Sequence, residues 1–360
     1  MVNQNYTPQA ENYFVQKPQY VMPTKNSAIV QFRDGTMYVQ AAIGDISVWD
    51  DKVFGRPFYF DLRPLVEGLV MPASIPYPQP TETEQMFRNI NLPELSVRVK
   101  EMGYTEWQTE TFRLLHAGLP DSLTTFLLTK RYSLEEFLRK KGFLSIGPLK
   151  RKTSLQQPEY LDFFNLTDHT ELQLRLRALT KVGWLSVYFP FLCEKYAIKR
   201  MHVQSAIFDF NFHFQEPEIE RYELAVCAGT TPVSEYHEYT IESHHSTNTQ
   251  YFGFINSIGG METFSVENIT EKISTKKEFS LKNITTNESR CTAVENINEF
   301  TATINTPKTA EEATFYAEFL QAEYTYRFFP SEKTIQRIYL PEGNTTIGTA
   351  DNYFTFQYII

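Results

Sequence analysis

The sequence Leu-Gln-Leu-Arg-Leu-Arg, residues 172–177, decides the fold class. Leu172, Leu174 and Leu176 alternate with polar side chains, which is the period of a strand with one buried face. The same alternation recurs along the chain, at residues 95–99, 208–214, 222–226 and 252–254. Short strands at this density, separated by turns, favour antiparallel sheets packed as sandwiches.

Composition also indicates a sheet-rich protein. The chain has 360 residues, of which 42% are hydrophobic, and it contains 29 Phe and 21 Tyr but only 15 Gly. Aromatic residues favour half-buried strands, and this length is typical of two or three domains. We therefore predict a mainly β protein with two or three β-sandwich domains of the immunoglobulin or fibronectin III type.

The predicted organisation has four segments. Residues 1–24 are rich in Asn, Gln, Tyr and Pro, and we expect an arm that folds onto a neighbour or stays loose. Two sandwich domains follow at 25–155 and 156–267, with their junction placed after the basic residues 150–152. A β-rich domain with one helix, 268–360, completes the chain.

The first domain opens with a predicted hairpin. Ile29–Phe32 and Met37–Val39 flank Asp34 and Gly35, a dipeptide that favours a tight turn between strands. The prolines between residues 72 and 80 then predict a loop.

Two helices interrupt the β pattern. The first is predicted near 134–141, where Ser133 and Glu136 form a capping box and Gly142 ends the helix. The second is predicted near 309–321, where Thr309 and Glu312 form another capping box. Its buried stripe is expected to consist of Ala313, Tyr316, Ala317 and Leu320.

Residues 208–214 provide one candidate ligand site. Four Phe alternate here with Asp209, Asn211 and His213, so a strand would place the three polar side chains on one face. Such a face can bind a cation or a polar ligand. The same face also arises in any half-buried strand without a ligand.

Metal and cofactor sites are not expected. The His and Glu residues between Glu235 and His245 are spaced so that a strand scatters them over both faces. Cys193, Cys227 and Cys291 are odd in number and lack metal-site spacing, so they are predicted to be small buried residues.

No enzyme is predicted. The nucleotide-binding, esterase, zinc-protease and kinase motifs are absent from the sequence. The 43 acidic residues leave a hydrolase that uses paired carboxylates as an open alternative. The net charge of −9 argues against nucleic acid as a partner. We expect no membrane insertion, no signal peptide, and synthesis in a cytoplasm.

Four segments resemble a group of tail-associated structural proteins in phages and prophages of Bacteroidetes. They are Phe60–Val66, Gln157–Phe163, Phe254–Phe264, and the helix at 309–320 with the strands that follow it. The third, Phe-Ile-Asn-Ser-Ile-Gly-Gly-Met-Glu-Thr-Phe, is similar to the most characteristic stretch of the group. Met261 stands where that group usually has Trp.

This resemblance implies a structural component of a virion, in the tail or baseplate. The implied partners are copies of the chain itself and other tail proteins, and the implied location is the virion tail. The resemblance carries no catalytic residue.

The Ile258–Met261 turn has two predicted roles. Gly259 and Gly260 allow a tight turn between two Phe-bearing strands. If accessible, Ile258, Gly259, Gly260 and Met261 would also serve as assembly or ligand contacts. The alternative function is a tail-fibre or adhesin module that binds a host-surface carbohydrate or receptor through a sandwich face or its loop tips.

Overall fold

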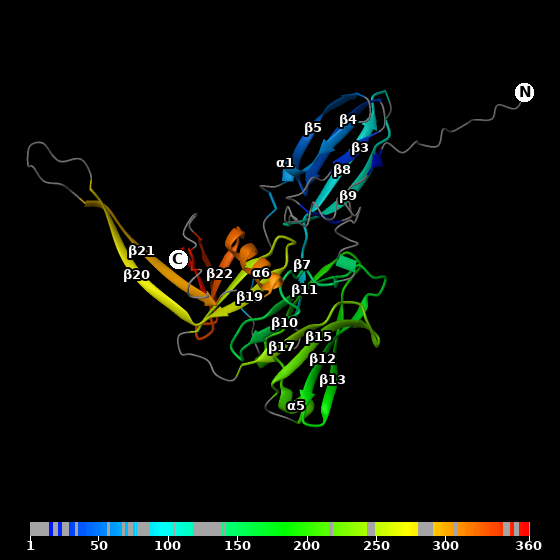
Figure 1. Ribbon diagram of the computed structural model, residues 1–360. Helices are drawn as coiled ribbons and strands as arrows, with labels where there is room; N and C mark the ends of the chain where they lie inside the picture. Colours follow the sequence, from blue (N-terminus) through cyan, green and yellow to red (C-terminus); the bar gives the residue numbers. More distant parts are fainter. Residues whose placement is uncertain are drawn as a thin grey trace, which may run out of the picture.

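The computed structural model describes residues 14–16, 21–23, 29–32, 35–55, 58–66, 69–70, 75, 77, 86–103, 105–117, 138–139, 141–215, 219–242, 249–279, 291–305, 309–340, 346–348 and 353–359 (Figure 1). The protein is mainly β and contains several antiparallel sheets, which confirms the predicted class. The sheets form an N-terminal, a central and a C-terminal unit.

The N-terminal unit contains two sheets. One has the strand order β2 (Val21–Pro23), β9 (Gln108–Leu115), β8 (Glu94–Glu101), β4 (Gly35–Ile43) and β5 (Ile46–Gly55). The other has the order β1 (Phe14–Gln16), β3 (Ile29–Phe32) and β6 (Phe58–Asp61), and α1 (Arg63–Val66) follows it. Alternate residues of β8 are fully buried, as predicted for residues 95–99.

Two predictions for this unit are wrong. Residues 29–32 and 37–39 do not form a hairpin, because β3 pairs with β1 and β6 whereas β4 pairs with β5 and β8. The segment 1–24 is not only an arm, because β1 and β2 lie within it and pair with strands of the same chain. The proline residues of the predicted loop at 72–80 lie outside the described residues.

The central unit contains two sheets packed face to face. The outer sheet has the order β10 (Lys150–Thr153), β17 (His237–Ile241), β15 (Arg221–Ala228), β12 (Glu171–Thr180) and β13 (Gly183–Leu192), with β16 (Thr231–Pro232) also on β15. The middle sheet has the order β11 (Tyr160–Phe164), β14 (Ile198–His202) and β7 (Phe87–Ile90). The alternation predicted at 172–177 and 222–226 is confirmed, because Leu174 and Leu224 face this common core.

The middle sheet is covered on both faces. All residues of β11 and β14 are buried. Leu161 and Phe163 pack into the core shared with the outer sheet, whereas Tyr160 packs with Phe328 and Met261 of the C-terminal unit. Because both faces are buried, these strands show no simple alternation of polar and apolar residues.

The strand predicted at 208–214 is not present, and residues 210–214 form a helix instead. After a short 3₁₀ helix, η1 (Ser205–Ile207), the chain forms α5 (Phe210–Phe214). The Asp209 carboxylate accepts a 2.9 Å hydrogen bond from the backbone N–H of Phe212 and so caps the helix. Phe210 and Phe214, four residues apart, are buried, but Phe212 is 77% exposed.

The C-terminal unit also has two sheets. The first has the order β19 (Met261–Val266), β18 (Gln250–Ile255), β22 (Thr325–Phe329) and β23 (Thr334–Ile338). The second has the order β20 (Asn268–Phe279), β21 (Cys291–Asn305), β25 (Tyr353–Ile359) and β24 (Thr346–Gly348). The aromatic side chains of β18 and β19 pack with Phe356 and Tyr358 of the second sheet.

The predicted C-terminal helix is α6 (Ala310–Gln321). Thr309 caps it by accepting a 3.1 Å hydrogen bond from the backbone N–H of Glu312, as predicted. The predicted buried stripe is wrong in part, because Ala313 and Ala317 are exposed whereas Phe315 and Phe319 are buried. The larger apolar area of Phe directs that side of the helix toward β18 and β19.

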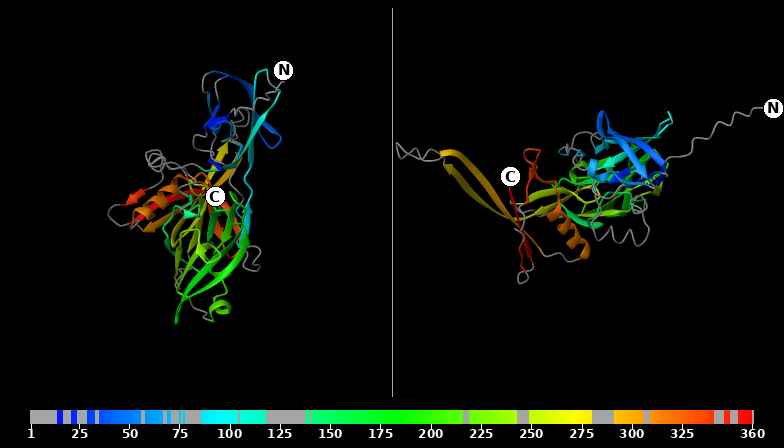
Figure 2. Two further views of the ribbon diagram at one scale, coloured as in Figure 1. Left: turned by 90° about the vertical axis from the view of Figure 1, so that its right-hand side faces the viewer. Right: turned by 90° about the horizontal axis from the view of Figure 1, so that it is seen from above.

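The β20–β21 hairpin projects from the body of the molecule. Figure 1 shows it as a long yellow ribbon, and the view from above in Figure 2 shows it extending away from the sheets. β25 pairs with β21 only from Glu299 to Asn305. Residues 273–279 and 291–298 therefore pair only with each other in the described part of the chain.

The sheets do not follow the boundaries predicted from the sequence. β10 precedes residue 156 but lies in the same sheet as β12 and β17. β18 and β19 precede residue 268 but lie in a sheet with β22. At the first predicted helix, Gly142 has a φ of +73° and donates a 2.6 Å backbone hydrogen bond to Leu138, as expected after a helix end. Ser133 and Glu136 lie outside the described residues.

Candidate functional site

The turn between β18 and β19 lies inside the molecule, where the three units meet. Ile258 is 1% exposed and Met261 is 2% exposed. A Cβ atom on Gly260 would lie 1.7 Å from the carbonyl oxygen of Leu144, and one on Gly259 would lie 3.0 Å from Cδ1 of Leu115. The turn is therefore packed against other parts of its own chain.

Asn256 shapes this turn. Its side-chain oxygen accepts hydrogen bonds from the backbone N–H groups of Ile258, at 3.1 Å, and Gly260, at 2.9 Å. Its side-chain nitrogen donates to the carbonyl oxygen of Leu144 at 2.8 Å. Ser257, the next residue, donates two hydrogen bonds to the Glu318 carboxylate on α6, at 2.9 and 2.8 Å. The turn thus connects β18, α6 and the segment before β10.

A buried ion pair lies directly beneath the turn. Asp162 on β11 and Arg200 on β14 are cross-strand neighbours. Arg200 donates from Nε and Nη2 to the two carboxylate oxygens of Asp162, both at 2.8 Å. Asp162 Oδ2 also accepts a 2.9 Å hydrogen bond from the backbone N–H of Met261. This carboxylate therefore links the central unit to the C-terminal unit.

Glu262 forms a second buried link beside the first. Its Oε2 lies 2.7 Å from Nη2 of Arg151, and its Oε1 accepts a 2.9 Å hydrogen bond from the backbone N–H of Ile146. Burial alone would raise the pKa of Glu262, but Arg151 and the hydrogen bond from Ile146 outweigh this effect and hold the pKa below its usual value. Glu262 is therefore ionised at neutral pH.

Glu159 is the third buried carboxylate of this junction. It accepts hydrogen bonds from the hydroxyl groups of Thr263, at 2.8 Å, and Thr153, at 3.2 Å. Burial raises the pKa of Glu159 to about 7, against the opposing effects of Arg151 and the two hydroxyl groups. We call Arg151, Glu159, Asp162, Arg200 and Glu262 the junction cluster.

The junction cluster holds the central and C-terminal units together. Its carboxylates accept hydrogen bonds from backbone and side-chain donors on both units, so each carboxylate fixes one unit against the other. A strongly shifted pKa also occurs in catalytic sites, but Glu159 is held by Thr153 and Thr263 and is fully buried. The cluster therefore supports rigid union of the central and C-terminal units.

The other predicted site residues do not converge. Asp209 caps α5, and His213 packs edge-on against Phe189 with the ring centroids 5.3 Å apart. Asn211 is exposed on the helix. The shared polar face predicted for Asp209, Asn211 and His213 required a strand, so it does not form.

Sequence analysis missed a partly exposed arrangement of arginines and aromatic rings on the outer sheet. The guanidinium groups of Arg177 and Arg221 lie 4.6 and 5.3 Å from the centre of the Trp184 ring. Arg175 lies 4.9 Å from the centre of the Tyr236 ring. The polar face of residues 173–177 was visible in the sequence, but Trp184 joins it only through the register of β12 with β13. We call this surface the arginine–aromatic face.

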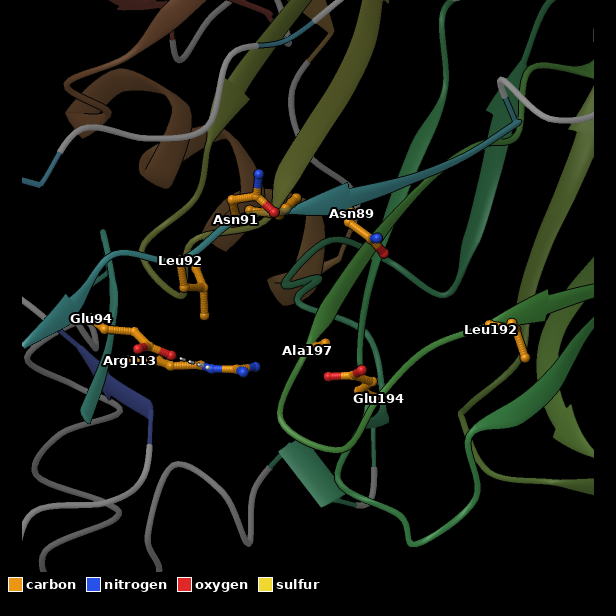
Figure 3. A pocket seen from close by; sticks show the side chains of 9 residues that line it. Asn89, Asn91, Leu92, Glu94, Arg113, Leu192, Glu194 and Ala197 are labelled. Atoms are coloured by element: carbon orange, nitrogen blue, oxygen red, sulfur yellow. Dashed lines mark ion pairs between the residues drawn. The ribbon is translucent and has the colours of Figure 1, made fainter. Parts of the chain in front are cut away.

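A polar pocket of about 500 Å³ lies between the N-terminal and central units. Its lining residues are Asn89, Ile90, Asn91, Leu92, Glu94, Arg113, Leu192, Glu194 and Ala197. Figure 3 shows Arg113 paired with Glu94, at 3.6 Å, and pointing across the opening toward the side where Glu194 lies. Amide, carboxylate and guanidinium groups suit a ligand with several hydrogen-bonding groups.

Metal ligands do not cluster among the residues that the structure describes: no three His, Cys, Asp or Glu side chains lie close enough to hold an ion. His237 and Tyr239 face the core from β17, as the strand period predicted, while His244 and His245 lie outside the described residues. Cys193 and Cys227 are buried thiols, as predicted, and the Cys291 side chain lies outside the described part of the chain. In the described ranges, no helix is both long and apolar enough to span a membrane.

Comparison with known proteins assigns no family. The chain matches no model of a protein family, and no curated protein matches it.

Proposed function

We propose that this chain is a structural subunit of a phage tail or baseplate, or of a related prophage-derived particle, and that it acts by assembling with copies of itself and with other tail proteins. The resemblance of four sequence segments supports the particle type. No enzymatic step is part of this proposal.

The observation that carries the proposal is the projecting β20–β21 ribbon. An isolated two-stranded ribbon is only marginally stable in water. Residues 273–279 and 291–298 extend beyond β25 and the rest of their sheet. A ribbon of this kind gains stability when another chain covers it, so it is suited to contacts between subunits.

The junction cluster supports the same function. A subunit that transmits load or fixes the spacing of its neighbours must hold its own units in one arrangement. Buried ionic pairs with several hydrogen bonds enforce such an arrangement because a shifted unit would leave a buried charge without its partner.

The proposal is tested by mass photometry and light scattering on the full-length chain and a ribbon-shortened variant. In this variant Asn-Gly replaces residues 273–298, because Lys272 and Glu299 lie opposite each other and a two-residue turn can join them. We expect discrete oligomers for the full chain and smaller species for the variant.

A second deletion tests the N-terminal segment. It removes residues 1–13 only, because Phe14 is buried and β1 pairs with β3. A full-length chain that stays monomeric at every concentration, alone and with other proteins of its particle, contradicts the structural proposal.

The finer fold prediction also remains a proposal. The face-to-face packing of the outer and middle sheets supports a sandwich of the immunoglobulin or fibronectin III type in the central unit. A crystal structure tests this proposal through the strand order of the central unit. The first pair to check in it is β10 with β17, which run parallel.

The arginine–aromatic face favours one second candidate, a module that binds a host-surface carbohydrate or receptor. Aromatic rings stack on sugar rings, and the guanidinium groups of Arg177 and Arg221 can donate hydrogen bonds to hydroxyl or carboxylate groups. A glycan array tests it with Trp184→Ala and the control Tyr339→Ala, an exposed tyrosine on the C-terminal unit. Glycan binding that is lost only in Trp184→Ala would favour this candidate.

A further inference from the structure

β13 is a long open sheet edge that carries no charged residue and a single proline, Pro190. It ends the strand order of the outer sheet and spans ten residues, none of them charged. Leu192 on β13 and Val182 in the adjacent turn are 68% and 83% exposed. Natural edge strands are normally protected by charges, prolines, bulges or short length, and a long apolar edge is a site for pairing with another chain.

Other open edges in the described ranges differ from β13. β10 has only four residues and carries Lys150 and Lys152. β5 carries Asp50, Asp51 and Lys52 and is bulged where it pairs with β4. β23 contains Arg337, and β24 has three residues. Among these edges, β13 combines length with an uncharged sequence.

The outward-facing backbone groups of β13 can be assigned. A two-residue turn joins Thr180 to Gly183, so this pair is hydrogen bonded and alternate residues from Gly183 onward face β12. Trp184, Ser186 and Tyr188 consequently direct their N–H and C=O groups outward. Pro190 falls in the same outward set, which agrees with the rule that an edge-strand proline directs its missing N–H toward solvent.

β20 provides a second open edge of suitable length, and it carries charges that β13 lacks, on Glu271, Lys272, Lys276, Lys277 and Glu278. It spans twelve residues and ends the strand order of its own sheet. Its outer half pairs only with β21, so one further strand would convert the ribbon into a three-stranded sheet, which is the smallest arrangement with independent stability.

The two edges cannot meet within one molecule. Figure 1 shows the ribbon on one side of the body and β13 on the opposite side, with the central unit between them. A contact between the ribbon of one copy and β13 of the next is therefore head-to-tail, and such contacts generate rings or filaments.

We propose that β13 is the acceptor edge for the β20–β21 ribbon of a second copy of this chain. β20 adds to β13 over residues 184–188, and Pro190 limits the pairing at one end. This inference rests on the proposed structural function and specifies the contact through which copies assemble.

The direct test uses a photo-crosslinking amino acid at Thr275 on β20 in a mixture of isotope-labelled and unlabelled chains. Mass spectrometry identifies the crosslinked peptides and shows whether they come from two different copies. We expect mixed-isotope crosslinks between residue 275 and residues 183–189. Crosslinks confined to one copy, or to another region of the second copy, overturn the proposal.

A matched pair of variants tests the acceptor edge. Ser186→Pro removes an outward N–H and leaves the hydrogen bonds to β12, whereas Ser186→Ala retains that N–H. We expect Ser186→Pro to weaken self-association roughly tenfold, because one carbonyl on the ribbon loses its donor. Both variants should show the same circular dichroism and the same thermal midpoint.

The outcomes separate the two proposals. Oligomers that persist in Ser186→Pro, together with crosslinks elsewhere, overturn the β13–β20 contact and leave the structural function standing. A full-length chain that remains monomeric overturns both.

Discussion

At the residue scale, the junction cluster contains more acid than base. Two arginines, Arg151 and Arg200, face three buried carboxylates, on Glu159, Asp162 and Glu262. Asp162 and Glu262 each have a paired guanidinium group, so the excess negative charge falls on Glu159. A buried carboxyl group without its own cation binds a proton more readily.

This arrangement predicts that Glu159 makes stability depend on pH. Its pKa is raised from the ordinary glutamate value of 4.5 to about 7 in the folded chain, so the folded state binds the additional proton. The stabilisation is complete below about pH 4.5 and is lost as the pH rises toward 7, with a change on the order of 3 kcal/mol.

The measurement is urea unfolding of the wild type and Glu159→Gln at pH values near 5 and 8. The free energy of unfolding should fall more steeply with rising pH in the wild type than in Glu159→Gln, which stays neutral. Comparing the two proteins cancels the titration of all other groups. Parallel pH profiles would contradict this role for Glu159.

At the element scale, α5 shows how a local hydrogen bond overrides an alternating pattern. Phe at every second position from 208 to 214 is typical of a strand. Asp209 instead caps a helical turn, and the helical period then places Phe212 in solvent. Asp209 at the start of the segment is a signal for a helix cap, but the alternating Phe residues favoured a strand in the prediction.

Alanine substitutions distinguish the helix from the strand. In the helix, Phe210→Ala should lower the free energy of unfolding by about 3 kcal/mol, because Phe210 is 6% exposed, while Phe212→Ala should change it by less than about 0.5 kcal/mol. A strand with all four Phe on one face would give similar losses at both positions. Urea unfolding of the two variants measures the difference.

Local patterns predicted the strand at 172–177, which buries one face only, and the cap of α6, which is a hydrogen bond between residues three positions apart. The strands beside the Ile258–Met261 turn were recognised from their Phe residues and the turn glycines, although both faces of these strands are buried. β11 and β14 show no such pattern, because burial on both faces erases the alternation. β3 and β4 lie in different sheets because β3 pairs with β6 and β4 pairs with β8. Short-range turn signals do not specify these long-range pairs.

The candidate site was less accessible to sequence reasoning than the fold. The Ile258–Met261 turn was recognised as a turn, but its burial depends on Leu144 and Leu115, which are more than a hundred residues away. Asp162 and Arg200 become neighbours only through the register of β11 with β14. The sequence around each residue does not reveal such a pair, because a single Asp or Arg in a sequence is usually a solvent-exposed side chain.

At the scale of the whole molecule, the middle sheet joins the outer sheet to the C-terminal unit. The outer sheet packs on one of its faces, and β18 and β19 cover the other. The junction cluster lies at this second interface, so the two units should unfold together.

Asp162→Asn tests this coupling. It leaves the buried guanidinium of Arg200 without a charged partner, and breaking a buried pair in this way costs about 3–5 kcal/mol. We expect a lower midpoint in scanning calorimetry and separation of one transition into two. The control Asp168→Asn makes the same chemical change in the exposed pair with Lys195 and should leave the midpoint unchanged. Equal effects of the two substitutions would contradict the coupling.

The position of β7 has a consequence for how this protein can evolve. β7 belongs to the middle sheet through β14, but β1–β6 before it and β8–β9 after it belong to the N-terminal unit. The chain thus leaves the N-terminal unit, returns to it and leaves again. A single genetic crossover cannot exchange this unit for a foreign one without also replacing a strand of the central core. The two units should therefore be inherited as one block.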